Sequence, residues 1–196
     1  MEPKFGEVEI RIKNKCYKYT TECIDNGLYR YVLRLSLKEA NNNKKIMFIL
    51  KNPSKANCEV SDRTLNRLAG WTLYHQIHNF TVCNIYARRA TKPEKLKAFS
   101  QNERIGEIND NKIKNCLRKH EEVILGWGTP KPLPEKDYNS RIKEILEFEE
   151  IKIKTKLFKV GDSSKEGYPK HPLGKPMWAY KAEKLPFDIQ KALESL

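Results

Sequence analysis

The side chains that could do chemistry are concentrated in four short segments, each following a stretch with the pattern of a strand. These segments are 51–54 (Lys-Asn-Pro-Ser), 84–89 (Asn84 with Arg88 and Arg89), 126–128 (Gly-Trp-Gly) and 167–173 (Gly-Tyr-Pro-Lys-His-Pro-Leu). They supply amides, one histidine, basic groups and aromatic rings. They supply no carboxylate pair and no serine or cysteine with an evident base, as acid–base glycosidases and covalent hydrolases require.

Phosphate-binding motifs are also absent from the sequence. It contains no G-x-x-x-x-G-K and no G-x-G-x-x-G, which argues against kinases and dinucleotide-dependent enzymes. An amide can donate and accept hydrogen bonds at once, and this suits the edge of a nucleobase. A histidine can stabilise negative charge on a carbonyl oxygen. The four segments therefore favour recognition of a base.

Each of these residues also has a structural interpretation. Asn52 precedes a proline, a pair common in turns, and Asp62 starts a predicted helix, whose dipole favours an acid there. The alternative for Asp62 is to orient an attacking water. Asn84 is harder to explain structurally, because a buried strand amide needs a partner. His171 alone would be a surface histidine, and Trp127 alone would pack under the sheet.

The elements that must hold these segments alternate along the chain. Residues 5–13 and 29–37 alternate apolar and polar side chains, which predicts strands of an antiparallel unit. The later pattern predicts strands over 45–50, 80–87, 121–128 and 151–160, helices over 62–77, 103–119, 135–148 and from 186, a loop over 161–177 and a short extended segment near 178.

This alternation predicts an α/β fold with three layers, α/β/α, around a central, mostly parallel sheet. We expect a single domain over residues 1–196, with residues 1–44 as an antiparallel extension. In such folds the ligand crevice lies beyond the carboxyl ends of the strands, where the four segments converge.

Charge points to a polyanionic partner. The 196 residues include 38 Lys and Arg against 25 Asp and Glu, a net charge of +13. A large basic excess is typical of proteins that neutralise phosphates, although it also fits a solvated, lysine-rich surface. Arg88 and Arg89 carry the same two interpretations.

Location and cofactors follow from what the sequence lacks. No stretch approaches the roughly 18 apolar residues of a membrane helix, and the N-terminus has no apolar signal-peptide core. The five cysteines are scattered without a C-x-x-C pair, which argues against disulfides and against zinc or iron–sulfur sites. We expect a cytoplasmic monomer with no metal, no cofactor and no membrane contact.

Five motifs together resemble a bacterial and phage family catalogued as a domain of unknown function, over about residues 45–175. They are N-P-S-x-A at 52–56, D-R-T at 62–64, "CNIYARRAT" at 83–91, "VILGWG" at 123–128 and "GYPKHPLG" at 167–174. Their order is also similar to that of the uracil-DNA glycosylase superfamily. There, a Gly-x-Asn-Pro-Gly motif precedes an Asn-containing strand, a Leu-(Trp/Gly)-Gly strand and a His-Pro-Ser loop.

The second resemblance implies a uracil-DNA-glycosylase-like fold and a monofunctional DNA glycosylase. Such an enzyme hydrolyses the N-glycosidic bond of a flipped-out base, here a modified or damaged pyrimidine, including a hypermodified phage base in anti-phage defence. Asn52 matches the asparagine that positions water, with Asp62 as a second candidate, and His171 matches the histidine that stabilises the departing base. Asn84 lies near the base-binding asparagine, and Leu173 near the wedge that fills the stack.

The remaining roles follow the same resemblance. Pro53 and Ser54 would form the turn beside the sugar, and Met177 is a second candidate for the wedge. Base stacking is assigned to Tyr86, Trp127 and Tyr168. Contacts to the backbone of double- or single-stranded DNA are assigned to Lys51, Lys55, Arg88, Arg89, Lys170 and Lys175.

Departures from the glycosylase pattern leave other functions open. Lys51 and Ser54 replace the glycines that flank the first motif, and the last motif reads H-P-L-G. The aspartate of the most active uracil branch is missing from the first motif. These departures are compatible with a glycosylase of altered specificity and with a protein that has lost catalysis. The alternatives are a non-catalytic nucleic-acid-binding protein on the same fold and an enzyme that hydrolyses free nucleosides or nucleotides.

Overall fold

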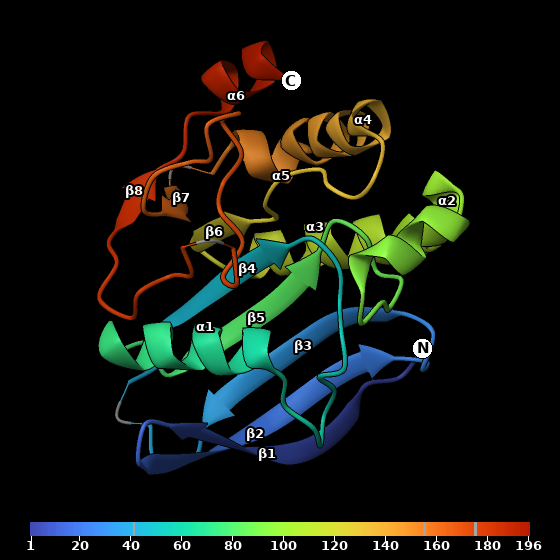
Figure 1. Cartoon of the computed structure of the whole chain (residues 1–196). Coiled ribbons are helices and arrows are strands. Elements are labelled where there is room, and N and C mark those ends of the chain that lie inside the picture. The colour runs from blue at the N-terminus through green and yellow to red at the C-terminus, as the bar shows by residue number, and fades with distance from the viewer. Residues whose placement is uncertain (41, 155, 175) are drawn as a thin grey trace.

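The computed structural model describes residues 1–40, 42–154, 156–174 and 176–196, and within them eight strands form one sheet. The spatial order is β1-β2-β3-β5-β4-β6-β7-β8 (Figure 1). The strands are β1 (Lys4–Ile12), β2 (Lys15–Asp25), β3 (Arg30–Leu37), β4 (Lys45–Leu50), β5 (Asn79–Asn84), β6 (Glu122–Gly126), β7 (Lys156–Val160) and β8 (Lys184–Pro186).

The sheet is mixed, with a parallel core of β4, β5, β6 and β7. The first three strands pair antiparallel with one another, and β3 pairs antiparallel with β5. The short β8 pairs antiparallel with β7. The α/β class and the N-terminal antiparallel strands are confirmed, whereas "mostly parallel" holds only for the core. Short turns such as the one at Lys13 and Asn14 can join only antiparallel strands.

Helices pack on both faces of the sheet. Their bounds are α1 (Arg63–Tyr74), the 3₁₀ helix η1 (Pro93–Ala98), α2 (Gln101–Ile105), α3 (Asn109–Lys119), α4 (Glu135–Leu146), α5 (Glu149–Lys152) and α6 (Ile189–Ser195). Across the described ranges, no helix has the length and apolar character needed to cross a membrane.

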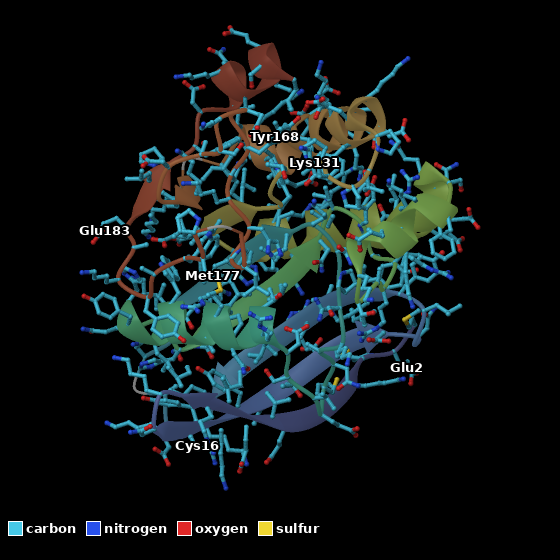
Figure 2. The ribbon with its side chains drawn as sticks, in the orientation of Figure 1. Glu2, Cys16, Lys131, Tyr168, Met177 and Glu183 are labelled. Carbon is cyan, nitrogen blue, oxygen red and sulfur yellow. The ribbon has the colours of Figure 1, made fainter. Side chains whose placement is uncertain are left out.

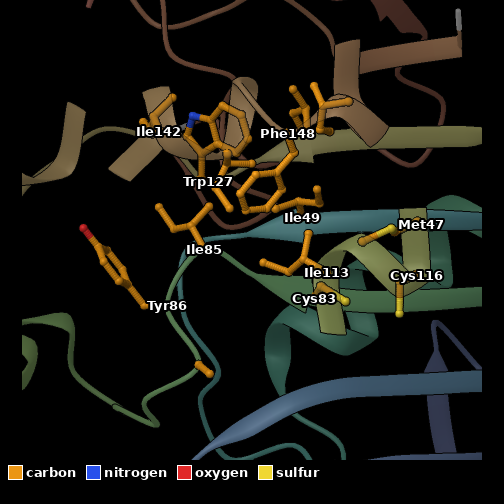
Figure 3. Close-up of a cluster of buried hydrophobic side chains, with 14 of the residues drawn as sticks. Met47, Ile49, Cys83, Ile85, Tyr86, Ile113, Cys116, Trp127, Ile142 and Phe148 are labelled. Carbon is orange, nitrogen blue, oxygen red and sulfur yellow. The ribbon is translucent and has the colours of Figure 1, made fainter. Parts of the chain in front are cut away.

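Two buried apolar clusters occupy the two faces, and β4 contributes to both. Phe48 belongs to the cluster beneath α1, with Leu68 and Trp71. The neighbouring Met47 and Ile49 belong to the other cluster (Figure 3). Successive side chains of a strand point to opposite faces, so a continuous apolar run marks a strand buried on both sides. This explains why "IMFIL" carries no polar residue.

Several predicted boundaries are wrong. The predicted helix over 103–119 is divided into α2 and α3 at Gly106, whose φ is +82°. A Cβ on Gly106 would lie 2.8 Å from the Tyr29 ring, so this break also lets β3 approach closely. The predicted strand over 151–160 begins instead with α5, and the segment near 178 is not a strand. The pattern analysis also missed β2.

Arg141 joins α4 to the chain that follows β5. Its side chain is 0% exposed, and its Nε donates to the carbonyl of Ile85 at 2.9 Å. The guanidinium pairs with Asp110 and, at 3.0 Å, with Glu144. A buried cation requires such partners because leaving water is costly for a charge.

Replacing Arg141 with alanine should lower the free energy of unfolding by about 3 kcal/mol, because a buried carbonyl loses its donor and a cavity remains. The matched control is Arg118→Ala, since Arg118 forms an ion pair with Glu150 but its own side chain is exposed. That change should cost less than about 1 kcal/mol. Denaturant unfolding of both variants measures the difference, and equal losses would contradict the role given to Arg141.

Candidate functional site

A cleft of about 830 Å³ lies where β4 and β6 end. The predicted residues that line it are Lys51, Asn52, Ser54, Trp127, Lys170, His171 and Leu173. Side chains that sequence reasoning missed also line it, among them Thr64, Thr91, Thr129, Lys131, Ser163, Ser164, Lys165 and Glu166. The first, third and fourth predicted segments therefore meet at one edge of the sheet, as expected for the carboxyl ends of parallel strands.

Asn52 is held in a fixed orientation by the main chain. Its Nδ2 donates to the carbonyls of Pro53 and Ala90, each at 3.0 Å. Ala90 in turn donates its N–H to the Pro53 carbonyl at 3.0 Å, so the chains after β4 and β5 are tied together. No partner for Oδ1 is found among the described residues. Asn52 therefore keeps a free acceptor, and its side chain lines both the cleft and a small cavity beside it.

His171 is a neutral hydrogen-bond donor. The N–H of Leu173 donates to His171 Nδ1 at 3.2 Å, so in the neutral ring the hydrogen sits on Nε2. Burial lowers the pKa of His171 to about 4, and the nearby charge of Lys51 adds to this, while Asp62 opposes it. The ring is therefore uncharged at pH 7 and has an N–H available on Nε2.

Gly128 allows the His171 loop to approach the end of β6. Its φ is +74°, and a Cβ there would lie 3.0 Å from the Cβ of His171. The N–H of Gly128 donates to the Pro169 carbonyl at 2.9 Å. On the other side of the loop, Trp178 Nε1 donates to the Lys170 carbonyl at 2.9 Å. The Trp-Gly motif and the His-Pro loop thus act as one unit.

Lys51 is bound to the main chain of the loop after β6. The side chain is buried, and its Nζ donates to the carbonyl of Thr129 and, at 3.1 Å, to that of Lys131. Burial lowers its pKa to about 8. Lys51 therefore ties the end of β4 to the loop after β6 and places a cation beside His171. Its role as a contact to the DNA backbone stays a prediction.

Asn84 lies in a small inner cavity next to the cleft. It is 1% exposed, and neither Nδ2 nor Oδ1 has a partner within the described part of the chain. The cavity, of about 20 Å³, is also lined by Arg30, Asp62, Asn52 and Thr64. The last two residues line the cleft as well. A space of this size holds roughly one water, and a buried amide requires a partner.

Asp62 caps α1. Its Oδ1 accepts the N–H of Leu65 at 2.9 Å, and its Oδ2 accepts the N–H of Ala56 at 3.3 Å. The carboxylate lines the inner cavity but not the cleft. These contacts fit the capping interpretation, and orientation of a water by Asp62 stays a prediction.

Two of the three aromatic residues assigned to stacking lie elsewhere. Tyr86 is fully buried and packs against Tyr138, and it does not line the cleft. Tyr168 also packs on Tyr138, and its hydroxyl donates to Asn139 at 2.7 Å (labelled in Figure 2). Their apolar surroundings draw both rings into the core. Trp127 does line the cleft, although it is 1% exposed and its Nε1 has no partner in the described chain.

Arg89 holds loops together, whereas Arg88 lies against aromatic rings. Arg89 forms an ion pair with Asp25 and donates to the carbonyls of Ser54 and Ala56. The Arg88 guanidinium lies 4.2 Å from the centre of the Phe99 ring. Neither lines the cleft, and their role in phosphate contact stays a prediction.

The other assigned residues take varied positions. Lys170 and Leu173 line the cleft, whereas Lys55 is exposed outside it and Pro53 is buried behind it. Met177 lies over α1, 3.7 Å from Arg67 (Figure 2). The assignment of Lys175 falls outside the described residues.

Sequence reasoning missed Arg30 and Lys131. Arg30 is buried and donates to the Ala56 carbonyl at 3.0 Å, and its Nε has no partner within the described ranges. Nothing in the local pattern of β3 marks it, because its position depends on the distant loop after β4. Lys131 follows a predicted strand, so the rule that found Lys51 could also have found it.

Titration should show that His171 is neutral at physiological pH. Its imidazole C–H resonances are expected to move with a midpoint near pH 4, well below the usual value of about 6.5. A pKa lower in the folded state means that the unfolded chain binds the proton more tightly. The stability from a neutral His171 is therefore complete above about pH 6.5 and is lost as the pH falls toward 4. A midpoint of 6 or higher would contradict this environment.

Gly128→Ala should displace the His171 loop, because the new Cβ meets His171 and the backbone has a positive φ. We expect the His171 pKa to rise toward its usual value as the ring becomes solvated. The matched control is Gly161→Ala, where φ is +61° but nothing lies within 4 Å of the added Cβ. The control should lose stability from backbone strain and leave the His171 titration unchanged.

The comparisons with known proteins place the chain in a family. Neither the curated proteins nor the solved structures contain a match. One family model, described as "Protein of unknown function (DUF1643)", matches residues 30–173. The match runs from the start of β3 to Leu173 and includes Asn52, Gly128 and His171. No link to uracil-DNA glycosylases is shown. Since the match spans more than half of the chain, the protein belongs to the DUF1643 family.

Proposed function

We propose that the protein is a DNA glycosylase that hydrolyses the N-glycosidic bond of a base flipped out of DNA. One observation carries this proposal: a neutral N–H donor at His171 and a fixed amide acceptor at Asn52 share one cleft. The similarity of motif order to the uracil-DNA glycosylase superfamily, with its three-layer fold, supports the same reaction.

His171 would stabilise the departing base. As the bond between C1′ and the base breaks, the bonding electrons stay with the base, and negative charge develops on its carbonyl oxygen. A fixed N–H aimed at that oxygen stabilises the charge as it forms. A pKa of about 4 makes the imidazolium a minor species at pH 7, so His171 acts as a donor and does not transfer its proton.

Asn52 would place the water that completes the reaction. Its Nδ2 is occupied by two carbonyls, so its Oδ1 accepts a hydrogen from the water and turns the oxygen toward C1′. The water adds to C1′, and its released proton neutralises the departed base. The water does not have to lose its proton to a strong base before it attacks. This suits a site with few carboxylates. Asp62 is the second candidate for this role, through the adjoining cavity.

Asn84 would read the base, and the cleft would accept a pyrimidine with a substituent. The unpartnered amide of Asn84 can both donate to and accept from a base edge, directly or through one water. The volume of about 830 Å³ lies in the upper part of the roughly 300–1,000 Å³ range of small-molecule sites. A modified pyrimidine, including a hypermodified phage base, therefore fits better than a bare one.

The charge of the chain supports a DNA substrate over a free nucleoside. Besides Lys51, which is bound to main-chain carbonyls, three lysines line the cleft, Lys131, Lys165 and Lys170, and the net charge of the chain is +13. Cations at the mouth of a base pocket contact the flanking phosphates. Leu173 lines the same cleft and would fill the gap left in the stack.

The test uses DNA duplexes carrying uracil, 5-hydroxymethylcytosine or glucosylated 5-hydroxymethylcytosine, and measures abasic sites. His171→Ala and Asn52→Ala should each lower the single-turnover rate about a hundredfold or more, the usual loss for one donor to a developing anion. His171→Gln keeps a neutral N–H and should retain intermediate activity. Asn111→Ala, at an exposed residue of α3, should match the wild-type rate.

The other outcomes separate the alternatives. Abasic sites on none of these DNAs, together with tight, salt-dependent binding, would favour a non-catalytic nucleic-acid-binding protein. Cleavage of mononucleotides with duplexes left intact would favour a nucleoside or nucleotide hydrolase. A His171→Ala variant as fast as the wild type would remove His171 from the mechanism.

A further inference from the structure

A second groove, of about 650 Å³, adjoins the cleft, and we call it the hairpin groove. Its walls come from the start of β1 at Lys4 and Phe5, from the loop after β4 at Lys55, and from η1 at Lys95. It shares Ser54, Ala90 and Thr91 with the cleft. The two hollows are therefore continuous across Ser54.

The loop after β4 is packed firmly on the β1–β2 hairpin. Thr21 Oγ1 donates to the Cys58 carbonyl at 2.6 Å, and Cys58 Sγ lies 3.2 Å from the Lys4 carbonyl. A Cβ on Gly6 would lie 2.6 Å from the Cys58 carbonyl oxygen, so only glycine allows this approach. The N-terminal hairpin is thus a fixed wall of the hairpin groove.

The hairpin groove is positively charged. Lys4, Lys55 and Lys95 are exposed, and none of them forms an ion pair within the described residues. Of the two acids in the lining, Asp25 is neutralised by Arg89, and only Glu59 has no cationic partner in the described chain. Three available cations therefore face one available anion.

Phe5 gives this groove an aromatic surface. Its side chain is 73% exposed at the rim, although most large apolar residues of the chain are buried. A basic groove with an exposed aromatic ring is the usual arrangement for single-stranded nucleic acid, because cations follow the phosphates and bases stack on the ring.

We propose that the hairpin groove holds the single strand of DNA that flanks the nucleotide in the cleft. Lys4, Lys55 and Lys95 contact its phosphates, and Phe5 stacks on one of its bases. The proposal rests on DNA being the ligand of the cleft, as in the proposed function. It assigns a binding role to the β1–β2 hairpin, which lies outside the residues matched by the family.

The test measures binding of a fluorescein-labelled twelve-nucleotide oligothymidine by anisotropy over a range of KCl concentrations. The combined change Lys4→Ala, Lys55→Ala and Lys95→Ala should raise Kd at least tenfold and lower the salt slope by about 2, because each single-strand phosphate contact contributes about 0.7. Phe5→Ala should raise Kd about tenfold through lost stacking, with an unchanged salt slope.

The control replaces three exposed lysines outside both hollows, Lys15, Lys119 and Lys181, with alanine. It removes the same net charge, so its smaller effect measures long-range attraction alone. Equal Kd values and slopes for the two triple variants would overturn the proposal, as would an unchanged Kd for Phe5→Ala. Thermal unfolding of every variant confirms that the fold is kept.

The outcomes distinguish this proposal from the glycosylase. Binding requires no catalysis. Weaker oligothymidine binding by the groove variants, with no abasic sites formed on any DNA, would therefore retain the proposal and reject the glycosylase. The wild type and the triple-lysine variant of the groove can also be compared on long DNA. If they excise the base at the same rate and reach half of that rate at the same DNA concentration, the role of the hairpin groove is rejected and the glycosylase is retained.

Discussion

The site depends on how the loop after β4 is held, because this loop has few backbone partners of its own. One buried and one half-buried arginine supply what is missing. Arg30 and Arg89 both donate to the carbonyl of Ala56, at 3.0 and 3.1 Å, and Arg89 also donates to Ser54. Cationic donors make strong hydrogen bonds to carbonyls in a medium of low dielectric. Asn52 at one end of the loop and Asp62 at the other keep their positions through these contacts.

The cleft combines buried cations with groups that stay neutral. Lys51 directs its ammonium at two main-chain carbonyls, which removes much of its charge from the open volume. Burial, and secondly the charge of Lys51, keep the pKa of His171 low, so its ring stays neutral. The result is a site in which the donor His171 and the acceptor Asn52 do not change protonation near neutral pH. Such a site suits a reaction in which the charge appears on the ligand.

Pattern and spacing predicted the elements whose stability is local. Strand β4 was predicted with its bounds because its apolar run is uninterrupted, and α4 because its apolar residues recur at helical spacing. The convergence of Asn52, Trp127 and His171 followed from parallel topology. Contacts between distant segments were not predictable: Lys51 and Arg89 appear as exposed cations in the sequence, and only the folded chain supplies their carbonyl partners. The buried position of Tyr86 was not predictable for the same reason, since it depends on packing against Tyr138 of α4.

The mixed direction of the sheet decides which residues can meet at all. Because β3 is antiparallel to β5, its first residue, Arg30, lies at the edge where β5 ends with Asn84. Two further reversals bring the end of β2 at Asp25 and the start of β1 at Lys4 to that same edge. One strand more or fewer between β1 and β5 would carry Lys4 to the opposite edge. The parity of the strand count thus fixes the composition of the binding edge, and a chain of this family can gain or lose N-terminal strands only in pairs if it is to keep the same ends there.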